Sequence, residues 1–219
     1  HYNRANEEAI VVGYLSIAEF EESFNEYGFA DSNLADAKIH SNNFRNSIEV
    51  YDDYSFGLIN VLNLHDVFGP KDRLAFFIKA NMFLVIDIED SDESTRELFK
   101  LCINRFKPEN TTLEKVIYSF FDGLLYDDNK IMENIEFSIS EMEDSVENSH
   151  IDKTFISELV DIKKELILIR NYYEQFVTLG EELQENENDL FKEEDLRYFK
   201  IFTDKVERLS NNTAMLRDY

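Results

Sequence analysis

The stretch FISELVDIKKELILIRNYYEQF, residues 155–176, decides how this chain folds. Its apolar residues recur at alternating spacings of four and three, which places them in one stripe along a helix. The stripe consists of Phe155, Leu159, Ile162, Leu166, Ile169, Tyr173 and Phe176. Such a heptad seam must be covered by another helix. The sequence therefore predicts a long helix that packs against other helices.

Two flanking segments offer faces of the same kind. The preceding segment carries Ile131, Ile135, Ile139, Met142 and Val146, and the following one carries Phe199, Phe202, Val206, Leu209, Thr213 and Leu216. We expect three long helices that need each other, or copies of themselves.

The predicted ends of these helices come from local signals. Ser149 can cap the middle helix near Asp152, and Gly180 is expected to close it. An acidic connection, Glu181 to Asp195, should be helical only in parts. The third helix, about Phe191 to Tyr219, contains neither Gly nor Pro. Because it is still in pattern at its last residue, we predict that it continues past Tyr219.

Composition narrows the function classes. The 219 residues are 43% hydrophobic and 14% aromatic, enough to bury a substantial core. Acidic residues number 46 against 22 basic ones, and the net charge of -24 opposes binding to nucleic acid and anionic membrane surfaces. Cations and basic partners are favoured instead.

The single cysteine, Cys102, allows no disulfide within the chain, which suits a reducing compartment, and we expect a buried thiol. The first residues lack the apolar core of a signal peptide. No window approaches the roughly 18 to 20 apolar residues of a membrane-spanning helix, so we expect these residues to lie outside a bilayer.

Residues 1–126 read as an α/β layered head with a partly antiparallel sheet. Ala9 to Tyr14 should be a buried strand, and Ser16 with Glu19 forms a capping box for a helix that ends at Gly28. A short helix, Asp31 to Ala37, and a loop, His40 to Asn46, should follow. The predicted hairpins pair Ile48–Tyr51 with Phe56–Leu64 through Asp52-Asp53, and Leu74–Ile78 with Met82–Ile88 through Asn81 at positive φ.

Two helices should complete the head. The first, Ser91 to Phe106, is expected to point Leu98, Leu101 and Cys102 inward and to stop before Pro108. The second begins at a predicted capping box, Thr111 to Glu114, and has a wide apolar face: Leu113, Val116, Ile117, Phe120, Phe121, Leu124 and Leu125. We expect it to run without a break through Tyr126–Asn129 into the long-helix part, residues 127–219.

Enzyme classes find little support. His65-Asp66 resembles part of a metal-dependent phosphohydrolase site, but His1, His40 and His150 lack the spacing of helical metal ligands. The sequence has no Gly-x-Gly-x-x-Gly, no P-loop and no Cys/His cluster. Asp52-Asp53 and Asp127-Asp128 are better interpreted as turn acids. We expect no enzymatic activity.

From about Asn25 onward the sequence resembles the cytoplasmic part of the CorA-type magnesium transporter family. The resemblance rests on the order and spacing of several segments: Asn33–Asp36, Ser47–Phe56, Lys79–Asn81, Tyr118–Leu125, Ile135–Asp144, Tyr198-Phe199 and Leu216–Tyr219. The Gly-Met-Asn signature between the family's two membrane spans is absent from these residues.

The resemblance implies a homopentamer in the plasma membrane, with this part in the cytoplasm and the last helix running into the first membrane span after Tyr219. It also implies regulatory Mg²⁺ sites at subunit interfaces, built by Asp36, Asp122 and an acid on the last helix. Where the family has that acid, three residues after Tyr198, this chain has Ile201. Our hypothesis is that Asp36 and Asp122 keep their affinity with help from Asp204, one helical turn away. The alternative is that all three are ordinary surface acids.

A group of acidic residues on the first long helix also has two interpretations, an ordinary surface and a functional one. Its members are Glu133, Glu136, Glu141, Glu143, Asp144 and Glu147. A solvated helix face is the plain interpretation, and the resemblance implies instead a tip that attracts cations or a basic ring near the membrane.

Two function classes remain. The first is the regulatory and gating domain of a divalent-cation transporter. The sequence does not distinguish among Mg²⁺, Co²⁺, Ni²⁺ and Zn²⁺ as the transported ion. The second is a soluble coiled-coil interaction or scaffold protein whose Phe155–Phe176 seam binds a partner helix.

Overall fold

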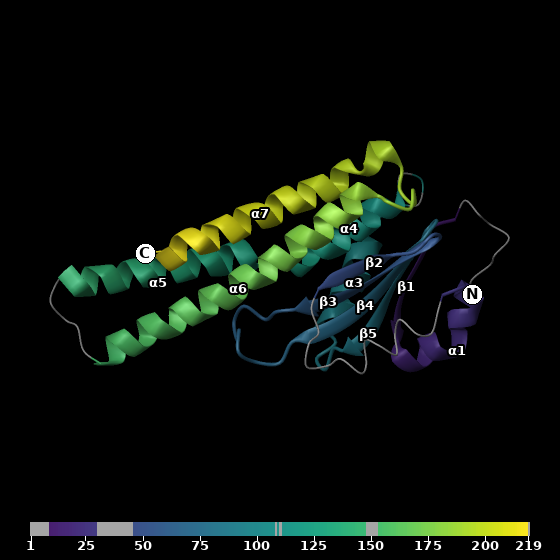
Figure 1. The fold of residues 1–219 in the computed structure, drawn as a ribbon. Coiled ribbons are helices and arrows are strands. Elements are labelled where there is room, and N and C mark those ends of the chain that lie inside the picture. The colour runs from purple at the N-terminus through teal and green to yellow at the C-terminus, as the bar shows by residue number, and fades with distance from the viewer. Residues whose placement is uncertain (1–8, 30–45, 108, 110, 148–152, 219) are drawn as a thin grey trace.

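The computed structural model describes residues 9–29, 46–107, 109, 111–147 and 153–218. A mixed sheet carries helices on both faces, and long helices extend past one end of it (Figure 1). The predicted helix Asp31–Ala37, residues 40–45 of the predicted loop and the Ser149 cap lie outside the described residues.

The sheet contains β1 (Val11–Ser16), β2 (Ser47–Val50), β3 (Tyr54–Val61), β4 (Asp72–Lys79) and β5 (Met82–Glu89), in the order β1-β5-β4-β3-β2. β2 to β5 are antiparallel neighbours, and β1 lies parallel to β5. Both predicted hairpins are confirmed. Asn81 takes φ 61° in the second turn, a conformation that asparagine tolerates better than most residues.

Helix α1 (Ile17–Tyr27) covers one face of the sheet. Its predicted capping box is confirmed, because the Ser16 backbone N–H donates to Glu19 Oε2 at 2.7 Å and the Glu19 backbone N–H donates to Ser16 Oγ at 3.3 Å. Gly28 ends the helix at φ 78°. Phe20 stacks on Phe77 of β4 with the ring centroids 4.9 Å apart, which holds α1 on the sheet.

Helices α3 (Ser94–Asn104) and α4 (Leu113–Leu124) cover the other face. Cys102 is buried as predicted, but the inward position of Leu101 was wrong: its side chain is 58% exposed. Thr95, Phe99 and Cys102 form the buried face, and Leu101 lies about 100° from Cys102 around the helix.

The capping box predicted before α4 was also wrong. Thr112 caps the helix, its Oγ1 accepting from the Lys115 backbone N–H at 3.4 Å. The Glu114 carboxylate, which the capping box would have used, is buried and accepts from the Lys192 backbone N–H at 3.0 Å. A tertiary contact therefore takes the place of the local one.

Helix α5 (Asp128–Glu147) starts after a break, so the predicted continuity through Tyr126–Asn129 was wrong. Leu125 leaves helical geometry at φ -110° and ψ 22°. Leu125 and Ile131 are both buried in one core cluster, whereas a straight helix would place them about 120° apart. The break brings both side chains to the same core.

Helix α6 (Lys153–Glu185) runs straight through Gly180, so the predicted stop at this residue was wrong. Gly180 lies where α6 approaches α7 (Arg197–Asp218): a Cβ there would come within 2.4 Å of Thr203 Oγ1. The glycine serves helix packing rather than helix termination.

The connection between α6 and α7 is helical only in parts, as predicted, with the short 3₁₀ helix η3 (Glu193–Asp195) before α7. Helix α7 begins six residues later than expected, since Phe191 is held in the connection. The Asn186 side chain donates to Phe191 O and accepts from the Phe191 backbone N–H, both at 3.0 Å. The six predicted core residues of α7 are all buried.

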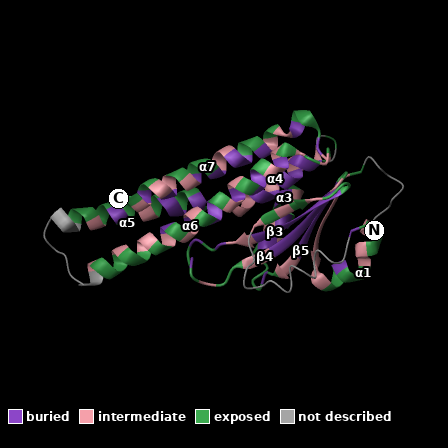
Figure 2. Cartoon of the chain, in the orientation of Figure 1, coloured by how far each residue is buried: buried purple, intermediate pink, exposed green. Residues whose placement is uncertain are grey.

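Burial along the α6 seam follows the reach of α7. Leu166, Ile169, Tyr173 and Phe176 are buried, whereas Phe155, Leu159 and Ile162 are only half-buried (Figure 2). Since α6 and α7 run antiparallel and meet at Gly180 and Thr203, Leu216 lies level with about residue 167 of α6. The half-buried part lies beyond the described end of α7.

One core cluster joins the sheet to α3, α4, α5, α6 and α7. The division of the chain at residue 126 stays a prediction. Among the described residues, no helix is both long enough and apolar enough to cross a bilayer.

We predict that Gly180→Ala destabilises the protein by about 1 to 2 kcal/mol in urea unfolding. Alanine favours a helix by about 1 kcal/mol over glycine, but the new methyl would displace Thr203 Oγ1 from its hydrogen bonds to Phe199 O and Gln184 Nε2. Adding Thr203→Ala removes the clashing atom and should recover part of the loss. Wild-type stability in the single variant would contradict the packing role of Gly180.

Candidate functional site

Asp122, one of the three predicted metal ligands, lies on α4 and faces α7. Its Oδ1 is 2.6 Å from Lys205 Nζ, which also donates to the Asp122 backbone carbonyl at 3.4 Å. Both side chains are partly buried, with 34% of the Asp122 and 21% of the Lys205 side chain exposed. The pair therefore joins α4 to α7 in a partly exposed position.

Lys205 also acts on a second carboxylate, Asp128 at the start of α5. Burial raises the pKa of Asp128 to about 6, opposed by the hydrogen bond from the Tyr173 hydroxyl at 3.1 Å and by the charge of Lys205. One ammonium group thus pairs with an acid of α4 and lowers the pKa of an acid of α5 by its charge. Lys205 was not predicted from the sequence, and Asp128 was interpreted as a turn acid. The available signal was the position of Lys205 beside the buried stripe that contains Phe202 and Val206.

The other predicted ligands are less closely joined. Asp204 is half-buried on α7 and pairs with Lys200, Nζ to Oδ1 at 3.2 Å, one helical turn away. Ile201, which stands where the family has an acid, is 48% exposed. Asp36 lies outside the described residues. The structure brings Asp122 beside the residue that follows Asp204, but each of the two carboxylates has its own lysine.

The donor set can be tested for a metal site. Among the described residues, Asp122 and Asp204 belong to no group of three acidic, histidine or cysteine ligands with atoms within 4.8 Å of one another. An ion at Asp122 would compete with the Lys205 ammonium. A single copy of the described chain therefore supplies isolated carboxylates at this place.

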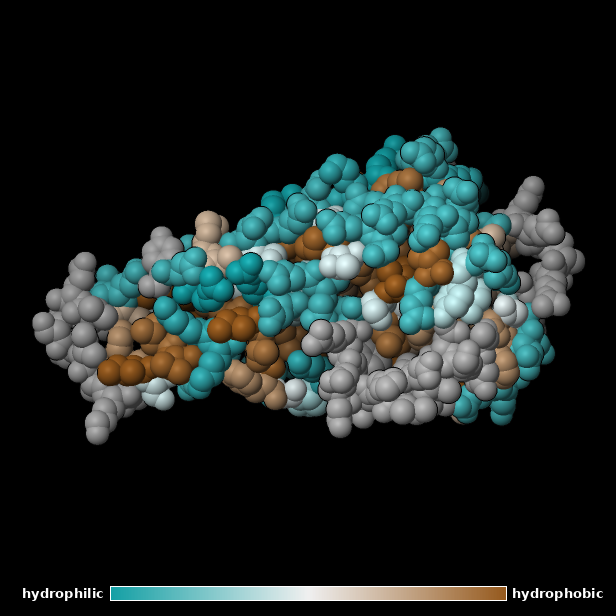
Figure 3. Space-filling model, viewed as in Figure 1, coloured by the Kyte–Doolittle hydropathy of each residue, from teal (hydrophilic) through white to brown (hydrophobic). Residues whose placement is uncertain are grey.

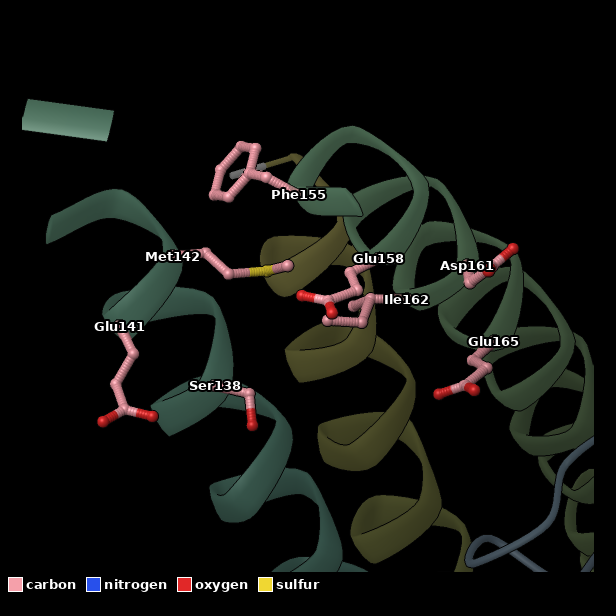
Figure 4. A pocket seen from close by; sticks show the side chains of 8 residues that line it. All are labelled: Ser138, Glu141, Met142, Phe155, Glu158, Asp161, Ile162 and Glu165. Atoms are coloured by element: carbon pink, nitrogen blue, oxygen red, sulfur yellow. The ribbon is translucent and has the colours of Figure 1, made fainter. Parts of the chain in front are cut away.

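A groove of about 530 Å³ separates the far parts of α5 and α6 (Figure 4). Apolar side chains, Met142, Phe155 and Ile162, line it together with acidic ones, Glu141, Glu158, Asp161 and Glu165. Burial, and to a lesser extent the charge of Asp161, raises the pKa of Glu165. The groove lies where the α6 seam is half-buried, beyond Leu216.

The acidic residues predicted at the α5 tip are exposed where their side chains are described: Glu133, Glu136, Glu141, Glu143 and Asp144. Figure 3 shows hydrophobic residues gathered over the N-terminal half of α6. Ile156, Val160 and Ile167 are among the exposed large hydrophobic side chains of this helix. Far from the sheet, the long helices therefore combine an acidic surface with an apolar one.

The model of the family described as "CorA-like Mg2+ transporter protein" matches residues 18–219. The chain belongs to this family. The match agrees with a mixed sheet followed by long helices, and with the resemblance seen in the sequence. No curated protein sequence matches the chain.

Several solved structures share the CorA-type fold. The complete CorA magnesium transporter from Methanocaldococcus jannaschii aligns with TM-score 0.71 and 16% identity, over 92% of this chain and 62% of that chain. The soluble domain of CorA from the same organism aligns with TM-score 0.66 and 18% identity, over 90% of this chain and 79% of that chain. The ZntB cytoplasmic domain from Vibrio parahaemolyticus RIMD 2210633 aligns with TM-score 0.54 and 14% identity, over 91% of this chain and 81% of that chain. The chain thus spans less than two thirds of the complete CorA transporter and most of the soluble domains.

We predict that Lys205→Met lowers the free energy of unfolding by about 1 to 3 kcal/mol, because it leaves Asp122 and Asp128 without their shared cation. The loss should be larger at pH 8 than at pH 5. The folded-state pKa of Asp128, about 6, exceeds the ordinary carboxyl value of 3.8, so its protonated form favours folding and stability falls as pH rises through this interval. Removing Lys205 raises this pKa further.

Urea unfolding at the two pH values measures the effect. The matched control is Lys200→Met, which removes the more exposed partner of Asp204 and should cost less than about 0.5 kcal/mol. The shared role of Lys205 would be contradicted if both variants lost the same free energy of unfolding. It would also be contradicted if the loss in Lys205→Met were the same at pH 5 and pH 8.

Proposed function

We propose that this chain is the cytoplasmic regulatory and gating part of a plasma-membrane transporter for Mg²⁺ or another divalent cation, and that it has no enzymatic activity. The observation that carries the proposal is the family match across residues 18–219. The net charge of -24 supports it, since an acidic surface raises the local concentration of cations.

The proposed assembly is a homopentamer in which α7 faces the neighbouring copies. α7 buries one stripe against α6 and exposes a different one. Ile201 and Met215, with 48% and 60% of their side chains exposed, lie two heptads apart on this outer face. Apolar residues at heptad spacing suit a contact between helices of neighbouring subunits.

The groove between α5 and α6 supports a continuation of the last helix. α7 packs against both α5 and α6 up to Leu216, and the groove lies beyond that point. We propose that the helix extends past Tyr219, covers the apolar side chains of the groove, and then enters the first membrane span.

The proposed Mg²⁺ sensor combines Asp36, Asp122 and Asp204 from adjacent subunits. Mg²⁺ keeps most of its water and needs only one or two carboxylates, which suits acids that do not converge within one copy. Lys205 and Lys200 pair with the two described carboxylates. Mg²⁺ would therefore exchange with these ammonium groups, and Ile201 would weaken the site by withholding a ligand.

Transport tests the proposal directly. The complete protein encoded with this chain, in liposomes that contain a Mg²⁺-sensitive dye, should admit Mg²⁺ or another divalent cation down its gradient. Parallel assays with Co²⁺, Ni²⁺ and Zn²⁺ identify the cargo. The control is the same preparation after denaturation. Liposomes that stay impermeable to all four ions would overturn the transport proposal.

Calorimetry tests the sensor. Titration of Mg²⁺ into the complete, assembled protein should release or absorb heat that Asp36→Ala and Asp122→Asn reduce, with apparent affinity falling about tenfold. Asp189→Asn removes an equal charge from an exposed loop residue that already has φ 54°, which asparagine accepts, and should bind as wild type does. Identical isotherms for all four proteins would assign Asp36 and Asp122 to the ordinary surface acids.

One observation favours the second candidate, a coiled-coil scaffold: Ile156, Val160 and Ile167 expose an apolar surface on α6 beside the seam. A partner helix could cover it in a protein with no transport role. A stop codon directly after Tyr219 and no cation flux would favour this scaffold, whereas two hydrophobic spans after Tyr219 would exclude it.

A further inference from the structure

Three aspartates meet at one end of the sheet, on elements that the proposed sensor does not use. Asp72 begins β4, and Asp90 and Asp92 lie between the end of β5 and the start of α3. One carboxylate oxygen from each lies within 4.8 Å of the other two. Asp90 is buried, Asp72 is half-buried and Asp92 is exposed, so the group reaches from the protein interior to solvent.

Asp90 is the residue that sets this group apart from an ordinary acidic surface. Only 8% of it is exposed. Its Oδ2 accepts three hydrogen bonds, from the Tyr14 hydroxyl at 2.8 Å, Thr95 Oγ1 at 2.6 Å and the Arg96 backbone N–H at 3.1 Å. Its Oδ1 is buried and accepts no hydrogen bond from the residues that the structure describes. A buried carboxylate oxygen without a donor is costly unless a cation or a proton satisfies it.

In the described part of the chain, no arginine or lysine side chain bonds Asp90 Oδ1. Arg96 donates to Asp90 through its backbone, and its guanidinium group lies over the Tyr14 ring at 5.3 Å. Arg73 pairs with Glu89 at 3.2 Å. Burial, together with repulsion from Asp90 and Asp92, raises the pKa of Asp72 to about 6, as expected where negative charge is poorly compensated.

Ser94 holds the two outer carboxylates in place. Its Oγ donates to Asp72 Oδ2 at 3.2 Å, and its backbone N–H donates to Asp92 Oδ1 at 3.0 Å. Asp92 is open to water, so an ion can enter from this side. The arrangement offers one preformed oxygen from the interior and two oriented oxygens at the surface.

We propose that Asp72, Asp90 and Asp92 bind one hard divalent cation, Ca²⁺ or Mg²⁺, through Asp90 Oδ1 and one oxygen of each neighbour. All-oxygen ligand sets suit these ions rather than zinc or copper. Ligand oxygens on opposite sides of Ca²⁺ lie about 4.6 to 5.2 Å apart, and those of Mg²⁺ about 4.0 to 4.2 Å apart, so the observed spacing admits both. The ion would tie β4 and β5 to the start of α3.

The test titrates CaCl₂ and MgCl₂ separately into the chain and follows binding by calorimetry and by the NMR shifts of the Ser94 and Arg96 backbone amides. Asp92→Asn and Asp72→Asn should each weaken binding at this site by at least about tenfold, with loss of the amide shifts at a given ion concentration. Both substitutions leave the Asp90 hydrogen bonds to Tyr14, Thr95 and Arg96 in place. Asp90→Asn is avoided because it disturbs that network.

Two controls separate this site from general acidity and from the proposed sensor. Glu93→Gln removes the same charge from the same loop but no ligand of the group, and should bind within about threefold of wild type. Asp122→Asn should leave the Ser94 and Arg96 shifts unchanged, whether or not the sensor proposal holds. The proposal is overturned if neither ion shifts these amides, or if the Asp72 and Asp92 variants respond as wild type does; a proton shared by the carboxylates would then account for Asp90 Oδ1.

Discussion

The close packing of α6 against α7 is the constraint on which the rest of the structure depends. Gly180 lets Thr203 approach the α6 backbone, and Gln184 bonds the Thr203 hydroxyl at 2.7 Å. This register carries the buried stripe of α7 along the α6 seam and places Lys205 against α4 and α5. Because the same core cluster continues into the sheet, the position of the long helices and that of the strands are set together.

Much of this fold could be predicted because period and turn chemistry are local signals. The hairpins, the Ser16 capping box and the buried stripe of α7 follow from residues near one another in sequence. The failures have a common cause in tertiary contact. Gly180 packs against another helix, Glu114 bonds a distant backbone, and Leu125 breaks its helix to share a core with Ile131.

The candidate sites also differ in whether local sequence or tertiary contact determines them. Asp122 was found through resemblance to a family, whereas Lys205, its partner 83 residues away in sequence, depends on how two helices meet. The group of Asp72, Asp90 and Asp92 could not be predicted either, since β4 and β5 bring Asp72 to the loop after β5 only in the folded sheet. The unpaired oxygen of Asp90 is visible only once its hydrogen bonds are known.

We propose that this CorA-family chain assembles with α7 facing its neighbours. Oxidative cross-linking of the complete protein in membranes tests it most directly, with Cys102 replaced by alanine and a single cysteine introduced at Ile201 on α7 or at Glu22 on α1. Both positions are exposed, and they lie on opposite sides of the sheet. We expect disulfide-linked dimers from Ile201→Cys and monomers from Glu22→Cys. Monomers from Ile201→Cys, or dimers from Glu22→Cys alone, would contradict it.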